Sequence, residues 1–335
     1  IITLLLSLLA FFVVFVIALM VGRYNIGVSD FFKAFFTNDA NYNIQRSIIY
    51  DLRLPRTLMA ALVGIGLSLS GLLYQETFRN NLVSPDLLGV SAGASVGAAI
   101  AIVLGLSSVF ISLFSFVAGL ITVFITVFIA RLFKNGSQTI LLLSGIIISG
   151  LMTSILSFIK YFADPETTLA SIAYWDMGTF QNAIMDEVWI LIGVVGSCTI
   201  LLLTIAWRIN IIGLGREDAQ TKGINYTFYR YLIIAVATLL TAICVCFCGK
   251  VSWIGLVIPH MVRMLVGRNT KRTIPLCITF GGVFMILCDI LARSFTDSEL
   301  PISAVTGLFG TVVFIAILFS KRRKLNEHLR RQHHW

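Results

Sequence analysis

The sequence RLPRTLMAALVGIGLSLSGLLYQ, residues 53–75, contains the features that decide the fold. Two arginines flank Pro55 just before a long apolar run, and proline is favoured in the first turn of a helix. Small residues along the run remove side-chain bulk, which lets neighbouring membrane helices approach closely; they are Gly64, Gly66, Ser68, Ser70 and Gly71. The pattern predicts a membrane-spanning helix in the packed centre of a helical bundle. Packing alone does not explain the two arginines at its start.

The composition of the whole chain points to the same class of protein. Of 335 residues, 58% are hydrophobic and only 12% are charged, against about 25% charged in a typical soluble domain. This excludes a soluble enzyme, a disordered chain and a coiled coil. An outer-membrane barrel is disfavoured because its strands alternate polar and apolar residues. The net charge of +9 is assigned to cytoplasmic loops, where basic residues gather, and no nucleic-acid partner is expected.

The apolar runs predict an all-α integral membrane protein with ten transmembrane helices. We expect one transmembrane domain over residues 1–320 and a basic cytoplasmic tail over 321–335. The eighth span is short, and Pro259 is expected to interrupt it, which is tolerated only where protein satisfies the freed backbone groups. The predicted spans are about 1–21, 57–78, 87–105, 109–130, 138–160, 188–207, 231–248, 253–267, 275–295 and 302–320.

Basic residues predict the orientation of these spans. With the N-terminus inside, 17 of the 25 Lys and Arg residues fall on the cytoplasmic side. Both termini are therefore expected to be cytoplasmic, with an inner loop at about 208–230. The segment 161–187 is expected outside, with a short interfacial helix at about 172–177. The first outer loop opposes the trend, because five basic residues lie between Arg23 and Arg56.

Motifs for chemistry within the chain are absent from the sequence. It has no phosphate-binding loop and no HExxH or GxSxG motif, so no ATPase site of its own and no metal site is expected. The six cysteines lie in apolar runs and are interpreted as buried small residues. An ion-coupled secondary transporter would use mid-membrane acids. Asp289 is the main candidate for such an acid, but Arg293 four residues later favours a local ion pair.

An inner loop carries the signals of a short helix. Residues 214–223 read LGREDAQTKG, with acids near the start and a basic residue and glycine at the end. A short helix bounded by glycines could dock into the groove of a partner. It could equally be an ordinary surface helix, and the residues alone leave both interpretations open.

Six motifs, taken together, resemble the FecCD family of permease subunits from ABC importers for iron-siderophores, haem and cobalamin. They stand in family order as RLPR (53–56), SGxxxQ (70–75), RNxLxxPxLLG (79–89), LGxxxAxxxG (214–223), GLVIPHxxR (255–263) and ELP (299–301). The resemblance extends from about residue 53 to about residue 320, and the first span also fits. Departures from the family pattern are Asn81, Arg216, Lys222, Asn269–Lys271, Ser303 and Thr311–Val312.

The resemblance implies an assembly in a bacterial inner membrane. Two permease chains, identical or different, would pack around a central pathway that opens alternately to each side. A pair of cytoplasmic ABC ATPases would supply the ATP cycle, and an extracytoplasmic substrate-binding lipoprotein would deliver an iron-siderophore or a similar chelate. The chain itself would bind no cofactor, and ATP would be used by the partner subunit. The alternatives are an ion-coupled secondary transporter and, less well supported, a membrane-embedded enzyme.

The resemblance also implies roles for particular residues. Arg53, Arg56 and Arg293 would receive glutamates of the binding protein, since the guanidinium fork suits carboxylates. Gln138 and Thr139 would form an inner gate before the fifth helix. Coupling to the ATPases would use Leu214, Gly215, Glu217, Asp218, Ala219 and Gly223.

A second interpretation of the outer arginines stays open at this point. They could form structural ion pairs within the chain, because Asp51, Asp289 and Asp297 lie near them in the sequence. For the residues of the inner loop, the alternative to a coupling role is the ordinary surface helix described above.

Overall fold

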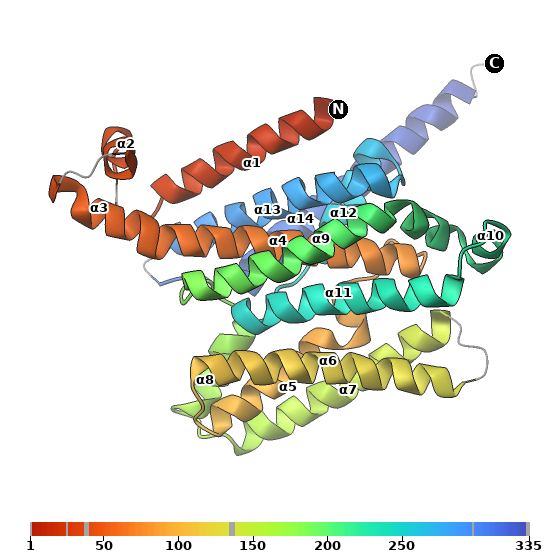
Figure 1. Ribbon diagram of the computed structural model, residues 1–335, viewed down its shortest axis with the longest axis horizontal. Helices are drawn as coiled ribbons and strands as arrows, with labels where there is room; N and C mark the ends of the chain where they lie inside the picture. Colours follow the sequence, from red (N-terminus) through yellow and green to blue (C-terminus); the bar gives the residue numbers. More distant parts are fainter. Residues whose placement is uncertain (1, 25, 37–39, 134–137, 297, 333–335) are drawn as a thin grey trace.

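A computed structural model of the chain describes residues 2–24, 26–36, 40–133, 138–296 and 298–332. Within these ranges every regular element is a helix, and the long helices run roughly side by side (Figure 1). Helix α4, Leu54–Thr77, lies in the middle. Four helices pack around it: α9 (Met185–Leu214), α11 (Tyr226–Cys248), α12 (Ile254–Val266) and α13 (Thr270–Ser294).

The small residues of α4 explain its central position. A side-chain carbon at Gly64 would collide with the backbone carbonyl of Gly281 in α13. One at Gly71 would collide with the carbonyl of Gly255 in α12. The serines bridge to neighbours as well, since Ser70 donates to the carbonyl of Ala237 in α11 at 2.8 Å. The prediction of a packed central helix is confirmed.

A second group of helices packs against α11 on one side of the molecule. It contains η3 (Pro85–Leu88), α5 (Val90–Val103), α6 (Ser108–Leu132), α7 (Gln138–Phe162) and α8 (Thr168–Met177). Figure 1 shows this group below α11. Gly93 and Gly97 of α5 allow α6 to approach, because a side chain at either position would strike Thr122 or the carbonyl of Phe114.

Within the described residues, ten apolar helices lie at the positions of the ten predicted spans. Seven are long and apolar enough to cross a membrane: α1 (Ile2–Met20), the helical stretch Asn43–Thr77 that ends in α4, α6, α7, α9, α11 and α13. Three are shorter, at Val90–Val103, Ile254–Val266 and Ile302–Ile317. The last is part of α14, Ile302–Gln332, so the predicted tail is helical as far as the structure describes it, and residues 333–335 lie outside the described residues. The chain is an all-helical, multi-pass membrane protein.

The predicted break at Pro259 is wrong. Pro259 lies inside the continuous helix α12, although proline cannot donate to the carbonyl four residues earlier. That carbonyl belongs to Gly255, and Gln75 of α4 donates to it through its side-chain nitrogen at 3.2 Å. The glutamine thus supplies the donor that the proline lacks, and the helix continues.

The loop predicted to be the first outer one contains more structure than the sequence indicated. Helix α2 spans Val28–Phe36, and a 3-10 turn, η1, spans Ala40–Tyr42. Then α3 (Asn43–Ser47) and the π-helical turn η2 (Ile48–Arg53) lead without a break into α4. The predicted second span therefore starts too late. The interfacial helix expected at 172–177 is present as the longer α8, and the inner-loop helix is α10, Arg216–Thr221.

Candidate functional site

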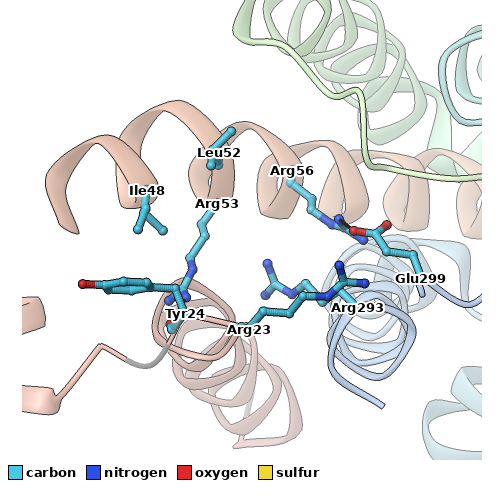
Figure 2. A pocket seen from close by; sticks show the side chains of 9 residues that line it. Arg23, Tyr24, Ile48, Leu52, Arg53, Arg56, Arg293 and Glu299 are labelled. Atoms are coloured by element: carbon cyan, nitrogen blue, oxygen red, sulfur yellow. Dashed lines mark hydrogen bonds and ion pairs between the residues drawn. The ribbon is translucent and has the colours of Figure 1, made fainter. Parts of the chain in front are cut away.

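The three predicted outer arginines lie together at one end of α4. Arg53 ends η2, Arg56 is in the first turn of α4, and Arg293 is in the last turn of α13. They line an open cavity of about 290 Å³ with Arg23, Tyr24 and Glu299, among others. Figure 2 shows Arg53 reaching towards Tyr24, whereas Arg56 turns towards Glu299.

Arg53 holds the end of the first helix. Its side chain is buried, and Nη1 donates to the carbonyls of Leu19 at 2.9 Å and Met20 at 2.6 Å. Nη2 donates to the carbonyl of Tyr24 at 2.5 Å. The last carbonyls of a helix have no partner within the helix, so Arg53 supplies the missing donors for α1. Because these acceptors are neutral, none of them neutralises the charge of Arg53.

Arg56 and Arg293 share one buried acid. Arg56 Nε lies 2.9 Å from Asp289 Oδ1, and Arg56 Nη1 lies 2.7 Å from Glu299 Oε1. Arg293 Nε lies 3.6 Å from Asp289 Oδ2, and its Nη2 donates to the carbonyl of Ala18 at 2.5 Å. The predicted Asp289–Arg293 ion pair is confirmed.

Intrachain ion pairs therefore exist for two of the three arginines, as the second interpretation predicted. Of the three acids proposed for them, Asp289 is the partner, Asp51 is exposed, and Asp297 lies outside the described residues. These contacts do not test the docking role of Arg53, Arg56 and Arg293, which stays a prediction.

The cavity lined by these arginines, predicted to face outside, keeps an excess of positive charge. Arg23, Arg53, Arg56 and Arg293 line it, against Glu299, with Asp289 behind. A carboxylate entering the cavity would meet guanidinium donors with the fork geometry that it prefers. Arg23, which is exposed, and Glu299 were missed as site residues, although Arg23 is a basic residue just after the first span and Glu299 begins the quoted ELP motif.

At the opposite end of α4, the predicted coupling helix α10 sits on the end of α9. Its two acids, Glu217 and Asp218, are exposed, and so are Leu214 and Gly223. Ala219 is fully buried inside the chain, so it seats the helix instead of facing a partner. Gly215 has φ of +129°, a conformation that glycine adopts readily.

The predicted gate residue Gln138 joins two helices at this end. Its side-chain nitrogen donates to the carbonyl of Thr77 in α4 at 3.0 Å and to the hydroxyl of Tyr226 in α11 at 3.2 Å. Tyr226 begins α11, five residues after α10 ends. Thr139 is exposed. Gln138 thus bonds to the end of the central helix and to the helix that follows the coupling segment.

A buried ion pair completes this region. Glu76, at the end of α4, lies 3.1 Å from Arg263 of α12. A side-chain carbon at Gly213 would lie 2.7 Å from Glu76, and one at Gly215 would lie 2.9 Å from Arg79. We call Glu76, Gln138, Gly215, Tyr226 and Arg263 the inner joint. Sequence reasoning missed Glu76, Tyr226 and Arg263 as site residues, although Arg263 closes one of the quoted motifs.

The described residues thus define a multi-pass membrane protein with an arginine-lined cavity at one end and the short helix α10 at the other. The model of the FecCD transport family matches residues 8–320. The chain therefore belongs to the FecCD transport family and is the permease subunit of an ABC importer. Such a permease is not an enzyme, because ATP hydrolysis takes place in a separate subunit, and it works with ATPase and binding-protein partners.

Relatives with different cargoes resemble this chain along most of its length. The molybdate import system permease MolB of Haemophilus influenzae is 34% identical over 93% of this chain and 94% of its own. An iron chelatin permease of Helicobacter pylori is 31% identical over 87% of this chain and 88% of its own. A solved ABC transporter of the metal-chelate type, in an inward-facing conformation, has 34% identity and a TM-score of 0.86 over 95% of this chain and 99% of its own.

Proposed function

We propose that this permease imports an iron-siderophore, or a similar metal chelate, across a bacterial inner membrane. It does so with ten spanning helices, both termini in the cytoplasm, and a second permease chain that is either a copy or a different protein. A pair of cytoplasmic ABC ATPases drives it, and an extracytoplasmic binding lipoprotein delivers the chelate. The chain itself binds no cofactor.

The observation that carries this mechanism is the contact between the coupling helix and the inner joint. Helix α10 is seated by Ala219, and five residues after its end Tyr226 begins α11 and accepts a hydrogen bond from Gln138. Movement of α10 by the ATPases would therefore displace Gln138 and the end of α4 together. Exposed Glu217 and Asp218 are available to the ATPase surface. The result is a shift of population between two states of the pathway, driven by the partner's ATP cycle.

The outer cavity supports a docking role for Arg53, Arg56 and Arg293. Arg53 is the strongest of the three candidates, because its hydrogen bonds go to neutral carbonyls and leave its charge uncompensated. Arg56 and Arg293 already share Asp289. The exposed Arg23 at the rim extends the positive surface towards an approaching carboxylate and steers its approach.

The ion-coupled alternative finds little support in the same region. Asp289 is fully buried and lies against two arginines of the same chain, which gives it a structural role as their shared partner. A proton carrier must instead gain and lose its proton during transport. The permease mechanism needs no such cycle in this chain.

Molybdate is the second candidate cargo, favoured by the 34% identity to MolB over 93% of this chain. Uptake measurements decide between the two cargoes. The permease is reconstituted in proteoliposomes with its ATPase and binding protein, and labelled ferric siderophore, molybdate and cobalamin are offered in turn. Preferential uptake of the ferric chelate supports the proposal, and preferential uptake of molybdate or cobalamin contradicts the proposed cargo.

The coupling role is tested in the same vesicles. Glu217→Arg reverses an exposed charge of α10 and is expected to abolish most ATP-driven uptake while the amount of folded permease stays unchanged. Lys222→Glu, at the other end of the same helix, is the matched control for a surface charge change. Normal uptake with Glu217→Arg would contradict the assignment of α10 as the coupling helix.

A further inference from the structure

Helix α2 lies at the charged end, and neither the transport mechanism nor the docking site uses it. It follows α1 after a short loop and carries four phenylalanines in nine residues, VSDFFKAFF. Figure 1 shows α2 nearly end-on, whereas α1 and α4 run along the page. Since α1 and α4 follow the direction in which the chain crosses the membrane, α2 lies crosswise to that direction.

The side chains of α2 divide into three faces. Phe31 and Ala34 are buried against the protein. A second face is apolar but exposed, and its residues follow helical spacing along one side; they are Val28, Phe32, Phe35 and Phe36. Ser29 and Lys33, four residues apart, form a third face that is exposed and polar. A helix with separate protein, apolar and polar faces fits a position between protein, lipid and water.

The buried face of α2 indicates the depth at which this helix lies relative to the membrane. Phe31 and Ala34 pack in one cluster with Leu19 of α1 and Ile49 of η2. Leu19 lies at the very end of α1, an apolar helix whose surface is mostly left uncovered by the described residues, and we take this surface to face lipid. Helix α2 thus lies where the lipid-facing surface of α1 ends, which is the boundary between acyl chains and headgroups.

We infer that α2 is a membrane-surface helix that lays Val28, Phe32, Phe35 and Phe36 on the bilayer beside the end of α1. Its chemistry suits that boundary, where amphipathic helices and aromatic side chains are enriched. Phe35 stacks on Tyr50 with ring centroids 5.5 Å apart, and the Lys33 ammonium lies 5.8 Å from the ring of Tyr42. The aromatic face is thereby held towards lipid while Lys33 remains in contact with water.

This role is independent of the cargo and of the partner subunits. It would hold the outer end of α1, which Arg53 and Arg293 also bind through carbonyls of Leu19 and Ala18, at a fixed depth. The alternative occupant of the apolar face is a partner protein. The experiment below distinguishes the two occupants.

The test measures the surroundings of single nitroxide spin labels in the permease reconstituted in lipid nanodiscs. Labels are placed by cysteine substitution at Phe32, Phe36 and Lys33; the six native cysteines are buried and are replaced by serine if they react. Collision of each label with molecular oxygen, which concentrates in lipid, is compared with collision with a water-soluble nickel chelate. Phe12 of α1, 65% exposed, is the lipid reference, and Glu166 in an exposed loop is the water reference.

We expect the oxygen-to-nickel collision ratio at Phe32 and Phe36 to be raised severalfold over that at Lys33 and to lie between the values at Glu166 and Phe12, because Phe12 lies in the middle of α1. Phe36 is 76% exposed, so its substitution removes little packing, and Phe32 provides an independent second site. Nickel collision at both sites equal to that at Glu166 would overturn the inference. Protection that develops only after the binding protein is added would assign the face to a protein partner and would also overturn it.

Discussion

The two ends of α4 differ in how far their positive and negative side chains balance. At the end that begins with Arg53, three buried arginines share two acids and several backbone carbonyls, so positive charge remains in excess. At the other end, Glu76 and Arg263 form a single balanced pair among closely packed glycines. In the proposed mechanism, the excess buried charge receives a carboxylate from outside, and the Glu76–Arg263 pair beside tight backbone contacts passes on the displacement of α10. The same helix thus links a surface suited to capture with a joint suited to movement.

The largest expected effect tests the charge at the arginine end. Asp289→Ala leaves Arg56 and Arg293 as like charges without their shared acid. Breaking a buried pair in this way costs about 3–5 kcal/mol of unfolding free energy, measured by denaturation of the purified permease. Asp51→Ala, which removes an exposed acid two residues from Arg53, is the control and is expected to change stability by less than about 0.5 kcal/mol. Equal losses in both variants would show that the buried acid has no special role.

The next largest effect on stability is expected where α4 packs closely against glycines of its neighbours. Gly71→Val forces a branched side chain against the carbonyl of Gly255. Overpacking of this kind costs about 1–3 kcal/mol or more and is expected to slow uptake by separating α4 from α12. Gly150→Ala in α7 is the matched control, because nothing lies within 4 Å of its side-chain position. Thermal unfolding of the two variants gives the comparison, and a tolerated Gly71→Val would contradict the packing of α4.

A smaller effect is expected at the rim of the outer cavity. Arg23→Glu replaces an exposed arginine that lines the cavity, and rim contacts of this kind contribute about 0–1 kcal/mol. Association of the binding protein with nanodisc-held permease should weaken slightly, mainly through a slower on-rate that depends on salt. A compensating Glu→Arg change on the binding protein should restore part of the loss. Arg330→Glu, in the basic tail at the opposite end, is the control; an equal loss there would remove the docking interpretation for Arg23.

The smallest expected effect concerns the exposed acid Asp164, which serves as a reference for the buried charges. The pKa of Asp164 is lowered from its ordinary value, chiefly because the Thr167 hydroxyl donates to its carboxylate, together with backbone N–H groups. A lowered pKa in the folded state stabilises the fold above the ordinary pKa and loses that effect as pH falls through the lowered value. Thr167→Val should raise the pKa of Asp164 towards its ordinary value in a carbon-13 titration. Ser171→Ala, whose hydroxyl bonds to a carbonyl instead, should leave that pKa unchanged, and an equal shift would contradict the assignment.

Local patterns in the sequence predicted the features that depend on neighbours along the chain. Each of these features lies within a single segment, so its structural role can be inferred without knowledge of the fold. They are the small residues of α4, the glycine-bounded α10 and the ten apolar runs. Helix α2 was missed because nine residues rich in phenylalanine in an outer loop do not make a span. The Glu76–Arg263 pair joins residues 187 positions apart, and no pattern in one sequence brings such residues together.

The contacts of the three arginines could also be predicted only in part. Their position against the positive-inside trend predicted a specific role for these arginines. Asp289 was correctly paired with Arg293 because the two residues lie on one helix. The bonds of Arg53 to the end of α1 could not be predicted, since any backbone carbonyl offers the same acceptor. Only packing decides which carbonyl lies within reach.

The central claim is that a partner's ATP cycle, acting through α10, drives transport through this chain. It is tested most directly in proteoliposomes that contain permease, ATPase and binding protein, by measuring uptake of the labelled chelate with ATP inside the compartment that α10 faces and with all ion gradients collapsed by ionophores. The account predicts full uptake under these conditions and loss of uptake when ATP is omitted or Glu217→Arg is present. Uptake that continues without ATP and stops when the ion gradients are collapsed would contradict it.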